Sequence, residues 1–268
     1  MFSGGGFFDK KQQYWFRRVA IKSRKNFEID MAKPVTLKVI LLSCSKEPER
    51  TVTAAIRQCY SPVGASELRK KVDKKTQKRL IKQVISSGHT STIEHASFTF
   101  AIEGISRACS HQFVRHRIAS FSQQSQRYVD LSKGELPYIM PPEIKRDKKL
   151  RGKFHLAMEK AQEEYRNLIK AGTRPEDARF VLPNACETKI VVTMNARALQ
   201  NFFRLRCCNR AQWEVRAMAW QMLKLVKEVA PIIFANCGPS CRTEKICWEG
   251  KLSCGLWQKI KGGELKER

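Results

Sequence analysis

The segment with the most side chains that can do chemistry is QFVRHRIASFSQQSQRY, at residues 112–128. Arg115, His116 and Arg117 are consecutive, and hydroxyl and amide side chains separate them from Arg127. Arginine keeps its charge and donates paired hydrogen bonds, which suits phosphate groups. Three interpretations are open at this point: a nucleic-acid-binding strip, a solvated helix face, or a pocket for a phosphorylated ligand.

The whole chain is strongly basic, with a formal net charge of +26 over 268 residues. Such a charge attracts nucleic acids, anionic surfaces and phosphorylated small molecules alike, so it indicates a class of partner rather than a function. The runs RKKVDKKTQKR at 69–79 and KRDKKLRGK at 145–153 are typical of exposed helices. Part of the charge is therefore expected to be solvated surface.

The cysteines and the apolar segments bear on the compartment. Ten cysteines in a chain of this length, with no apolar signal-peptide core near Met1, favour a reducing cytoplasm over a secreted disulfide scaffold. No run of about 18 apolar residues is present, so we expect no membrane span. The predicted protein is cytoplasmic and has no membrane partner.

Four cysteines lie near the end of the chain: Cys237, Cys241, Cys247 and Cys254. Four thiolates can bind zinc tetrahedrally, but the usual CxxC pairs are missing, since three, five and six residues separate these cysteines. We expect an ordinary tail with a turn at CGPSC and no metal; a structural metal or a redox pair is the alternative. Cys207 and Cys208 are expected to be packed helix residues rather than catalytic thiols.

Three segments of different composition divide the chain. Residues 1–30 have a glycine run and scattered aromatics without a period, which indicates an N-terminal extension that is disordered or not native. A targeting peptide is the weaker alternative, because acidic residues interrupt its basic character. Residues 31–236 are predicted to form one catalytic domain, and residues 237–268 a tail rich in cysteine and lysine.

Hydrophobic periodicity predicts alternating strands and helices within the domain. The expected strands are a buried one at 36–42, a half-buried one at 96–104 and one at 188–195. Two of the expected helices are defined by one end: one ends at Gly88, and one is capped by Ser106 and runs to Arg115. The other expected helices are 47–59, 142–171, 174–183, 196–208 and 211–236. Trp220, Leu223 and Val226 are expected in the core. The fold class is therefore mixed α+β, with a central sheet flanked by long helices. No GxGxxG or P-loop motif is present, so side chains must hold any nucleotide.

Five ordered blocks carry a resemblance to a known family. RHRIASFSQQS is RHR followed by seven residues and a serine, and GHTSTIEHASFTF precedes it. ARFVLP at 178–183, MNARALQNFFRLR at 194–206 and RAQWEVR at 210–216 follow in order. Together they resemble the flavin-dependent thymidylate synthases, from about Gly88 to Arg216 and more weakly from Met31.

The resemblance implies a reaction and its partners. Members of this family methylate dUMP to dTMP; 5,10-methylenetetrahydrofolate gives the carbon, FAD passes a hydride and NADPH reduces the flavin. They are homotetramers whose active sites combine residues of neighbouring chains. The resemblance thus implies small-molecule partners, no specific nucleic acid and no membrane.

The resemblance also implies roles for individual residues. Against FAD it places Ser91, Arg115, His116, Arg117, Gln123, Asn195, Ala196, Arg197 and Asn201. Against dUMP it places Gln112, Arg115, Gln123, Gln124, Ser125, Gln126, Arg127, Arg179 and Arg206. The catalytic residue that the resemblance implies is Arg206, because the family places an arginine at the N3–O4 edge of uracil, where it would stabilise the charge that activates the ring.

Ser125 raises the question of a covalent mechanism. A serine nucleophile needs a neighbouring base, and His116, the only histidine in this stretch, is expected to serve the flavin. We therefore interpret Ser125 as a hydroxyl donor to the substrate and expect no covalent nucleophile. A turn serine that caps its own backbone is a better description of Ser120 and Ser122.

The helix from Ala196 tests this assignment. Arg197 and Asn201 are four residues apart and share a face, whereas Arg206 is nine residues past Arg197 and points to the other side. One helix can thus serve two pockets, which fits an oligomer with composite sites. A helix that ends before Arg206 explains the pattern equally well.

Two other functions are weighed. An RNA-binding protein fits the charge and FVRHRIASF, but no RRM, KH or zinc-finger pattern is present and the basic residues are not aligned with aromatics. A non-catalytic flavoprotein relative is the second alternative, and the presence of Arg179 and Arg206 argues against it.

Overall fold

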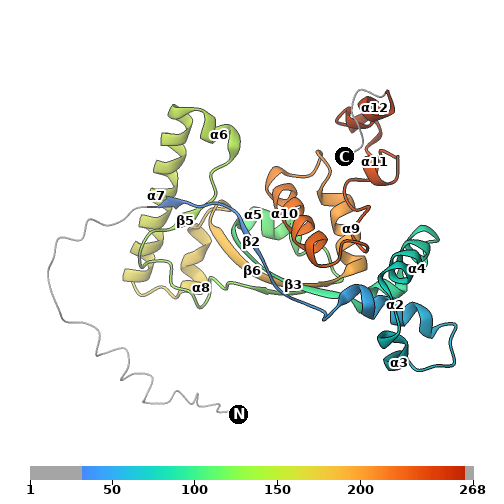
Figure 1. The fold of residues 1–268 in the computed structure, drawn as a ribbon. Coiled ribbons are helices and arrows are strands. Elements are labelled where there is room, and N and C mark those ends of the chain that lie inside the picture. Colours follow the sequence, from blue (N-terminus) through green and yellow to red (C-terminus); the bar gives the residue numbers. More distant parts are fainter. Residues whose placement is uncertain (1–31, 263–268) are drawn as a thin grey trace, which may run out of the picture. The chain divides into compact units, whose positions relative to one another are not determined.

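The structure is a computed structural model that describes residues 32–262. The interpretation of residues 1–30 as an appended extension falls outside the described residues and stays a prediction. The described part contains helices and strands in alternation, so the expected mixed α and β fold is confirmed (Figure 1). None of its helices is long and apolar enough to cross a membrane.

The centre of the fold is a four-stranded antiparallel sheet in the order β2-β3-β6-β4. Its strands are β2 (Lys38–Cys44), β3 (Ser97–Ser106), β6 (Glu187–Asn195) and β4 (Ser120–Gln123). A parallel pair of short strands, β1 (Lys33–Pro34) and β5 (Pro137–Tyr138), forms a second sheet.

The two inner strands, β3 and β6, carry the core. Phe98, Phe100 and Ile102 of β3 are fully buried and lie opposite Met194, Val192 and Ile190 of β6. Directly opposed apolar pairs of this kind stabilise a sheet and fix its register, since a slip by one residue would expose all of them. The expected half-buried strand at 96–104 and the strand at 188–195 are therefore confirmed.

The described helices belong to four groups. Beside the sheet core lie α5 (Arg107–Phe113), α9 (Ala196–Arg206) and α10 (Trp213–Val229) (Figure 1). Beyond β2 come α2 (Pro48–Gln58), α3 (Ala65–Lys70), α4 (Lys74–Ser86) and the 3-10 helix η1 (Thr90–His95). The group near β5 contains α6 (Pro142–Arg146), α7 (Lys148–Lys170), α8 (Pro175–Ala178) and η2 (Arg179–Val181), and the last segment contains α11 (Ser240–Thr243), η3 (Gly250–Leu252) and α12 (Leu256–Lys261).

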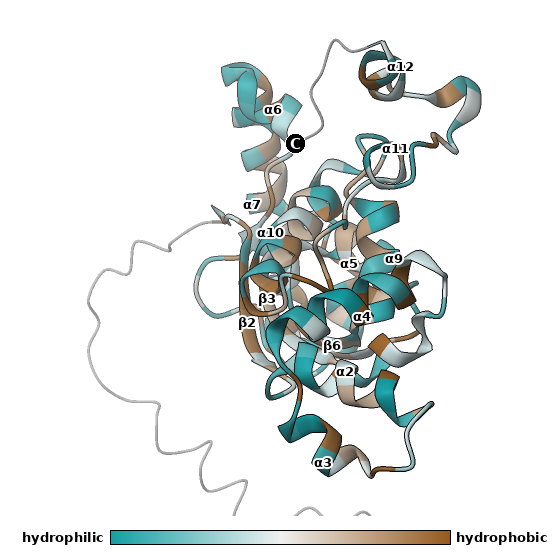
Figure 2. Cartoon of the chain, turned by 45° about the vertical axis from the view of Figure 1, so that its right-hand side comes forward, coloured by the Kyte–Doolittle hydropathy of each residue, from teal (hydrophilic) through white to brown (hydrophobic). Residues whose placement is uncertain are grey.

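Phenylalanine rings join these helices to the sheet. Phe113 of α5 contacts Phe202 of α9 with ring centroids 5.3 Å apart, and Phe202 contacts Phe203 at 5.8 Å. Phe203 then meets Phe234 at 6.0 Å, and Phe234 meets Phe98 of β3 at 5.3 Å. Edge-on and tilted contacts of this kind add specificity to the burial of large apolar surfaces. Figure 2 shows hydrophobic residues along β2 and β3 and hydrophilic ones on α4 and α6.

Several predicted boundaries are correct for identifiable reasons. The helix expected at 47–59 is α2, and Ser106 caps α5 by accepting a hydrogen bond from the backbone N–H of Cys109 at 3.0 Å. The helix expected to end at Gly88 is α4, and Gly88 follows it with a φ of 75°.

Other predictions are wrong. The single helix at 142–171 is two helices, because Asp147 is extended and caps α7, accepting from Lys149 N–H at 2.7 Å. The helix at 211–236 is shorter, since α10 ends at Val229 and Ala230 leaves the helical conformation, which is disfavoured before Pro231. Trp220 is 42% exposed and lies outside the core, unlike Leu223 and Val226.

The strand expected at 36–42 is present but shifted by two residues, and the expectation that it is buried is wrong. β2 covers Lys38–Cys44 at the edge of the sheet, and all its side chains are exposed or half-buried. The segment after α5 was expected to be only a turn, yet Ser120–Gln123 forms β4 against β6. A strand this short contains too little alternation to be recognised.

Gly104 shows how closely the chain approaches the sheet. Its φ is 68°, and a Cβ added there would lie 1.9 Å from the carbonyl oxygen of Thr36. Gly172 has a similar φ of 89°, but nothing lies within 4 Å of its added Cβ.

These two glycines give a matched pair of substitutions. Gly172→Ala should lower the free energy of unfolding by about 1–2 kcal/mol, the cost of a left-handed alanine. Gly104→Ala should cost clearly more, because it adds a backbone clash to the same conformational strain. Urea denaturation monitored by circular dichroism measures both, and equal losses would contradict the close approach to Thr36.

Candidate active site

The end of β6 and the start of α9 set up a strongly cationic cavity. Asn195 lies between them, and its side-chain oxygen accepts a hydrogen bond from the backbone N–H of Ala198 at 2.8 Å. Ala196 is buried, and its N–H donates to the carbonyl oxygen of Ala96 at 2.8 Å. The helix therefore begins at a fixed point, with Arg197 and Asn201 exposed along one side.

We call the space beside this helix the Arg206 cavity, with a volume of about 750 Å³. It is lined by Glu94, Arg115, His116, Arg117, Ile118, Met194, Asn195, Arg197, Ala198, Asn201, Leu205 and Arg206. The structure thus brings together most residues assigned to FAD, together with Arg206. Ser91, Gln123 and the buried Ala196 are assigned to the same cofactor but do not line this cavity.

Arg206 and His116 form the central contact of the cavity. The Nε–H of Arg206 donates a hydrogen bond to Nε2 of His116 at 3.0 Å. Burial, and then the charge of Arg206, lower the pKa of His116 from 6.5 to about 4. The imidazole is therefore neutral near pH 7 and can accept this hydrogen bond. In the described chain no other group binds the guanidinium of Arg206, so its two Nη groups can bind a ligand.

Packing holds the imidazole in this orientation. The ring of His116 meets the ring of Phe202 edge-on, with centroids 4.9 Å apart. Phe202 is fully buried and belongs to the chain of aromatic contacts that reaches the sheet. The direction of Arg206 is thus tied to the sheet core through His116 and Phe202.

The mouth of the cavity is strongly cationic. Glu94 is the only acidic residue among those that line it, and it pairs with Arg197 at 2.6 Å. Exposed pairs of this kind contribute only about 0–1 kcal/mol, so an anionic ligand can compete for Arg197. Arg115 and Arg117 form no ion pair within residues 32–262. The cavity can therefore bind a ligand that carries several negative charges.

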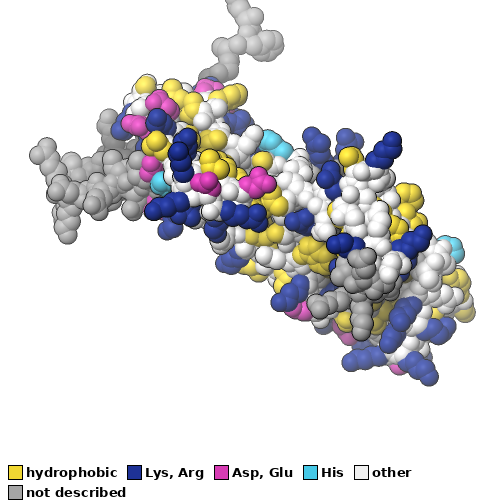
Figure 3. Space-filling model, turned by 90° about the horizontal axis from the view of Figure 1, so that it is seen from above, with side chains coloured by type: hydrophobic (Ala, Val, Ile, Leu, Met, Phe, Trp, Pro, Cys, Tyr) yellow, Lys and Arg dark blue, Asp and Glu magenta, His cyan; other side chains and the backbone are white. Residues whose placement is uncertain are grey.

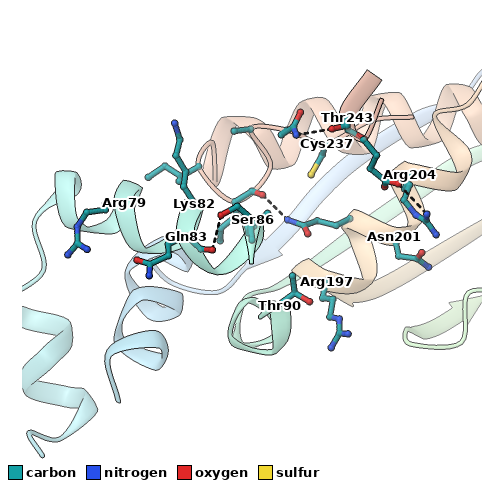
Figure 4. Close-up of a pocket in the computed structure, with 18 residues that line it drawn as sticks. Arg79, Lys82, Gln83, Ser86, Thr90, Arg197, Asn201, Arg204, Cys237 and Thr243 are labelled. Carbon is teal, nitrogen blue, oxygen red and sulfur yellow. Dashed lines mark hydrogen bonds and ion pairs between the residues drawn. The ribbon is translucent and has the colours of Figure 1, made fainter. Parts of the chain in front are cut away.

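A second cavity lies on another side of α9, and we call it the Lys82 cavity. Its volume is about 1,090 Å³. Arg79, Lys82, Gln83 and Ser86 reach it from α4, Arg197, Asn201 and Arg204 from α9, and Cys237 and Thr243 from the last segment (Figure 4). The sequence does not predict this cavity, because the basic residues of α4 have the same pattern whether the helix lines a cavity or faces open solvent.

The two cavities correct the expectation for α9. The helix includes Arg206, and Arg206 lines the same cavity as Arg197, so the two arginines are not divided between opposite pockets. The helix does serve two cavities, but Arg197 and Asn201 are the residues that line both.

The other residues assigned to dUMP form a separate group. The Ser125 hydroxyl accepts a hydrogen bond from the backbone N–H of Arg127 at 3.2 Å, and Arg127 forms an ion pair with Glu176 at 2.8 Å. Arg179 also turns toward Glu176, donating from Nε to its backbone carbonyl at 3.0 Å. The Gln123 side chain donates to the hydroxyls of Ser110 and Thr188. Gln112, Gln124 and Gln126 are half-buried, and no residue of this group lines the Arg206 cavity.

Ser125 makes the local turn bond that the sequence analysis assigned to Ser120 and Ser122, so that assignment was wrong. Its oxygen is engaged by Arg127 N–H, and within the described residues no hydrogen bond connects it to a histidine. Ser120 and Ser122 instead lie in β4.

Two residues that the sequence analysis did not single out support this region. Arg107 begins α5, and burial, then the charge of Arg179, lower the pKa of its guanidinium. Glu214 is buried and accepts hydrogen bonds from the backbone N–H and, at 2.8 Å, the hydroxyl of Ser106. Burial raises the pKa of the Glu214 carboxyl. The RAQWEVR block thus has a structural task, because Glu214 fixes the start of the helix that leads to His116.

Residues 40–232 match the protein family described as "Thymidylate synthase complementing protein". The chain is 52% identical to the flavin-dependent thymidylate synthase of Geobacter sulfurreducens, covering 84% of this chain and 97% of that protein. It is 48% identical to that of Clostridium tetani, covering 88% and 98%. The fold is similar to the crystal structure of a UMP/dUMP methylase, PolB from Streptomyces cacaoi, bound with 5-Br dUMP. The TM-score is 0.66 and the sequence identity is 25%, and the match covers 77% of this chain and 96% of that one.

The neutral state of His116 predicts a pH dependence. In the folded chain its pKa is about 4, against 6.5 as the ordinary value, so the unfolded chain binds the proton more readily between these limits. The contribution of His116 to stability should be complete above pH 6.5 and should be lost as the pH falls toward 4. Urea denaturation at several pH values measures this loss.

His116→Gln is the diagnostic variant, because glutamine does not titrate, and its stability should depend less on pH over this range. His111→Gln, an exposed histidine on α5, is the matched control and should retain the wild-type dependence. If both variants behave alike, His116 is not the titrating group.

Proposed function

The chain belongs to the flavin-dependent thymidylate synthase family, and from that premise we propose how its own residues methylate dUMP to dTMP. The proposed carbon donor is 5,10-methylenetetrahydrofolate, and the proposed reductant is NADPH. The observation that carries the proposal is the guanidinium of Arg206, which neutral His116 orients while its Nη groups stay available. The proposed compartment is the cytoplasm.

The proposed flavin is FAD, in the Arg206 cavity. The residues there fit such a group: Arg115, Arg117 and Arg197 can donate to a pyrophosphate, and Ile118 and Leu205 offer apolar contacts to a ring system. When bound, the flavin supplies the hydride of the reaction. The protein contributes the charge that holds it and the walls that exclude water.

Arg206 is the proposed catalytic residue. A uracil ring gains electron density at C5 when its N3–O4 edge is polarised or deprotonated. Two Nη groups held in a fixed direction stabilise the negative charge that develops at that edge, and they need no reorganisation during the reaction. Because the Nε–H is already engaged by His116, the guanidinium presents its outer edge to the ligand.

No covalent nucleophile is part of the proposal. The Ser125 oxygen already accepts from Arg127 N–H, and within the described residues it has no histidine to take its proton. Ser125 and Arg127 instead suit the phosphate of dUMP, because Arg127 could exchange its exposed pair with Glu176 for that charge.

The active site is proposed to combine two copies of the chain. Arg115 and Arg206 line one cavity, whereas Gln123, Ser125 and Arg179 lie outside it. The Arg206 cavity of one chain thus contains only one of the two groups assigned to dUMP. A neighbouring copy that brings its Arg179 group to the Arg206 cavity would complete the site, in agreement with the homotetramer implied by the sequence resemblance.

An RNA-binding function is less well supported. The Lys and Arg side chains are scattered over the face seen in Figure 3 and do not gather into one stripe. A single-strand-binding surface needs a continuous cationic groove with aromatic platforms.

The proposed reaction has a direct test. The FAD-loaded protein, incubated without oxygen with dUMP, 5,10-methylenetetrahydrofolate and NADPH, should produce dTMP, which chromatography detects. The purified protein should also be yellow. Oxidation of the flavin without any dTMP would contradict the synthase function, and a colourless protein that retains nucleic acid in a salt-dependent way would favour the RNA-binding alternative.

Single substitutions test the role of Arg206. Arg206→Ala should retain FAD, judged by its absorbance spectrum, and should lose about 100- to 1,000-fold in turnover, the usual cost of removing one preorganised donor. Arg146→Ala, an exposed arginine on α6, is the control and should turn over normally. Full activity of Arg206→Ala would refute its role in activating uracil.

Mixed oligomers test the shared site. Arg179→Ala should also be inactive, but co-expression of Arg206→Ala and Arg179→Ala chains with different tags should restore part of the activity. Restoration arises because some sites then combine an intact Arg206 with an intact Arg179 from another copy. No recovery in tandem-purified mixed oligomers would place both arginines in one chain's site.

A further inference from the structure

The last segment of the described chain folds back against the end of α9 and encloses a small cavity there, which we call the thiol cavity. Its volume is about 60 Å³, and its lining includes four cysteine side chains. These are Cys208, just past α9, and Cys241, Cys247 and Cys254 from the last segment. Cys237 does not line it and faces the Lys82 cavity instead.

The four thiols line the same small cavity, and none of them forms a disulfide. Four thiols that shared this space as thiolates would repel one another, so a cation that neutralises them would stabilise the fold of the segment.

One hydrogen bond already favours negative charge on sulfur. The backbone N–H of Arg210 donates to the Sγ of Cys208, two residues earlier, at 3.4 Å. The thiol of Cys247 donates to the hydroxyl of Ser253 at 3.4 Å, so it must lose this proton before its sulfur can bind a metal. Donors directed at ligand sulfur atoms are the outer contacts that orient thiolates around a metal.

We propose that Cys208, Cys241, Cys247 and Cys254 bind one structural zinc ion. Zinc prefers four thiolates in a closed tetrahedral site, with Zn–S bonds of about 2.3 Å, which places the sulfurs about 3.8 Å apart. No group of three or more His, Cys, Asp or Glu side chains in residues 32–262 is arranged to hold a metal as it stands. Binding of the ion must therefore draw the sulfurs inward, and Cys247 and Cys254 lie in the connections between the short helices of the last segment, outside any helix.

A single ion fits better than the other uses of four cysteines. The cavity has room for about two water molecules, which suits one ion more than an iron–sulfur cluster. A disulfide would use two of the thiols and leave two unexplained. The sequence analysis expected no metal and considered a different set of four as the alternative, because Cys208 joins the group only through the fold.

The zinc site would fasten the last segment to the turn after α9. Cys208 is two residues past Arg206, so the ion would also stiffen the end of the helix that carries Arg206. The family match ends at residue 232, and three of the four ligands lie beyond it. The inference does not rest on the proposed reaction.

Metal analysis of the full chain tests the site. The wild-type protein, purified without chelator and passed over a desalting column, should contain one zinc ion per chain by mass spectrometry of the metal. After cobalt exchange it should show the visible absorption of a tetrahedral thiolate site. Absence of zinc together with absence of that spectrum would overturn the proposal, as would iron with acid-labile sulfide or a disulfide between two of the four cysteines.

Serine variants in the same segment identify the ligands. Cys247→Ser and Cys254→Ser should lose the zinc, whereas Cys237→Ser should retain it and serves as the matched control. A chelator should lower the Tm of the wild type and of Cys237→Ser but should leave that of Cys247→Ser unchanged. Zinc loss from Cys237→Ser alone would assign the site to another set of cysteines.

FAD absorbance and dTMP formation, measured on the same samples, keep this test separate from the proposed function. Zinc bound to a protein that lacks turnover would leave the metal site intact and remove only the synthase. Turnover in a protein without zinc would remove the metal site and leave the proposed synthase function intact.

Discussion

The hydrogen bond from Arg206 to His116 forms only if the imidazole is neutral, although it lies beside a permanent cation. The surrounding structure must therefore keep His116 unprotonated. Burial meets that requirement, because it lowers the pKa of His116 before the charge of Arg206 adds its own effect. Phe202 packs edge-on against the imidazole and itself contacts Phe113 and Phe203. The surroundings that keep His116 neutral thus include a ring that belongs to the aromatic core.

The two ends of the contact come from separate parts of the sequence. Arg206 closes α9, which begins directly after the central strand β6, while His116 follows α5, which begins directly after β3. The pairing of β3 with β6 therefore decides how far apart the two helices start. Glu214 adds a third element by binding Ser106 where β3 passes into α5. A register error in the sheet would move Arg206 and His116 out of reach of each other.

The sequence predicts the parts whose signals are local. Alternation marks β3, a serine marks the start of α5, and ordered motifs identify the family. It fails where a neighbour distant in the chain decides the outcome. β4, for example, exists because β6 pairs with it. A local cap can also be missed, since Asp147 interrupts a helix whose periodicity continues across it. Cys208 looks like a packed helix residue until the last segment folds back to it. The grouping of site residues likewise depends on the fold, which divides one predicted list into the Arg206 cavity and the Arg179 group.

Arg197 and Asn201 stand in a wall common to two cavities, and this has a thermodynamic consequence. When the guanidinium of Arg197 turns toward a ligand in one cavity, it is no longer available to a ligand in the other. The conformational freedom that its side chain loses on binding the first ligand is also already lost when the second ligand binds. Binding on the two sides of α9 is then linked, and linkage is reciprocal: whatever factor one occupant applies to the affinity of the second, the second applies to the first. The affinity of each cavity for an anion can thus depend on whether the other cavity is occupied, without any larger movement of the protein.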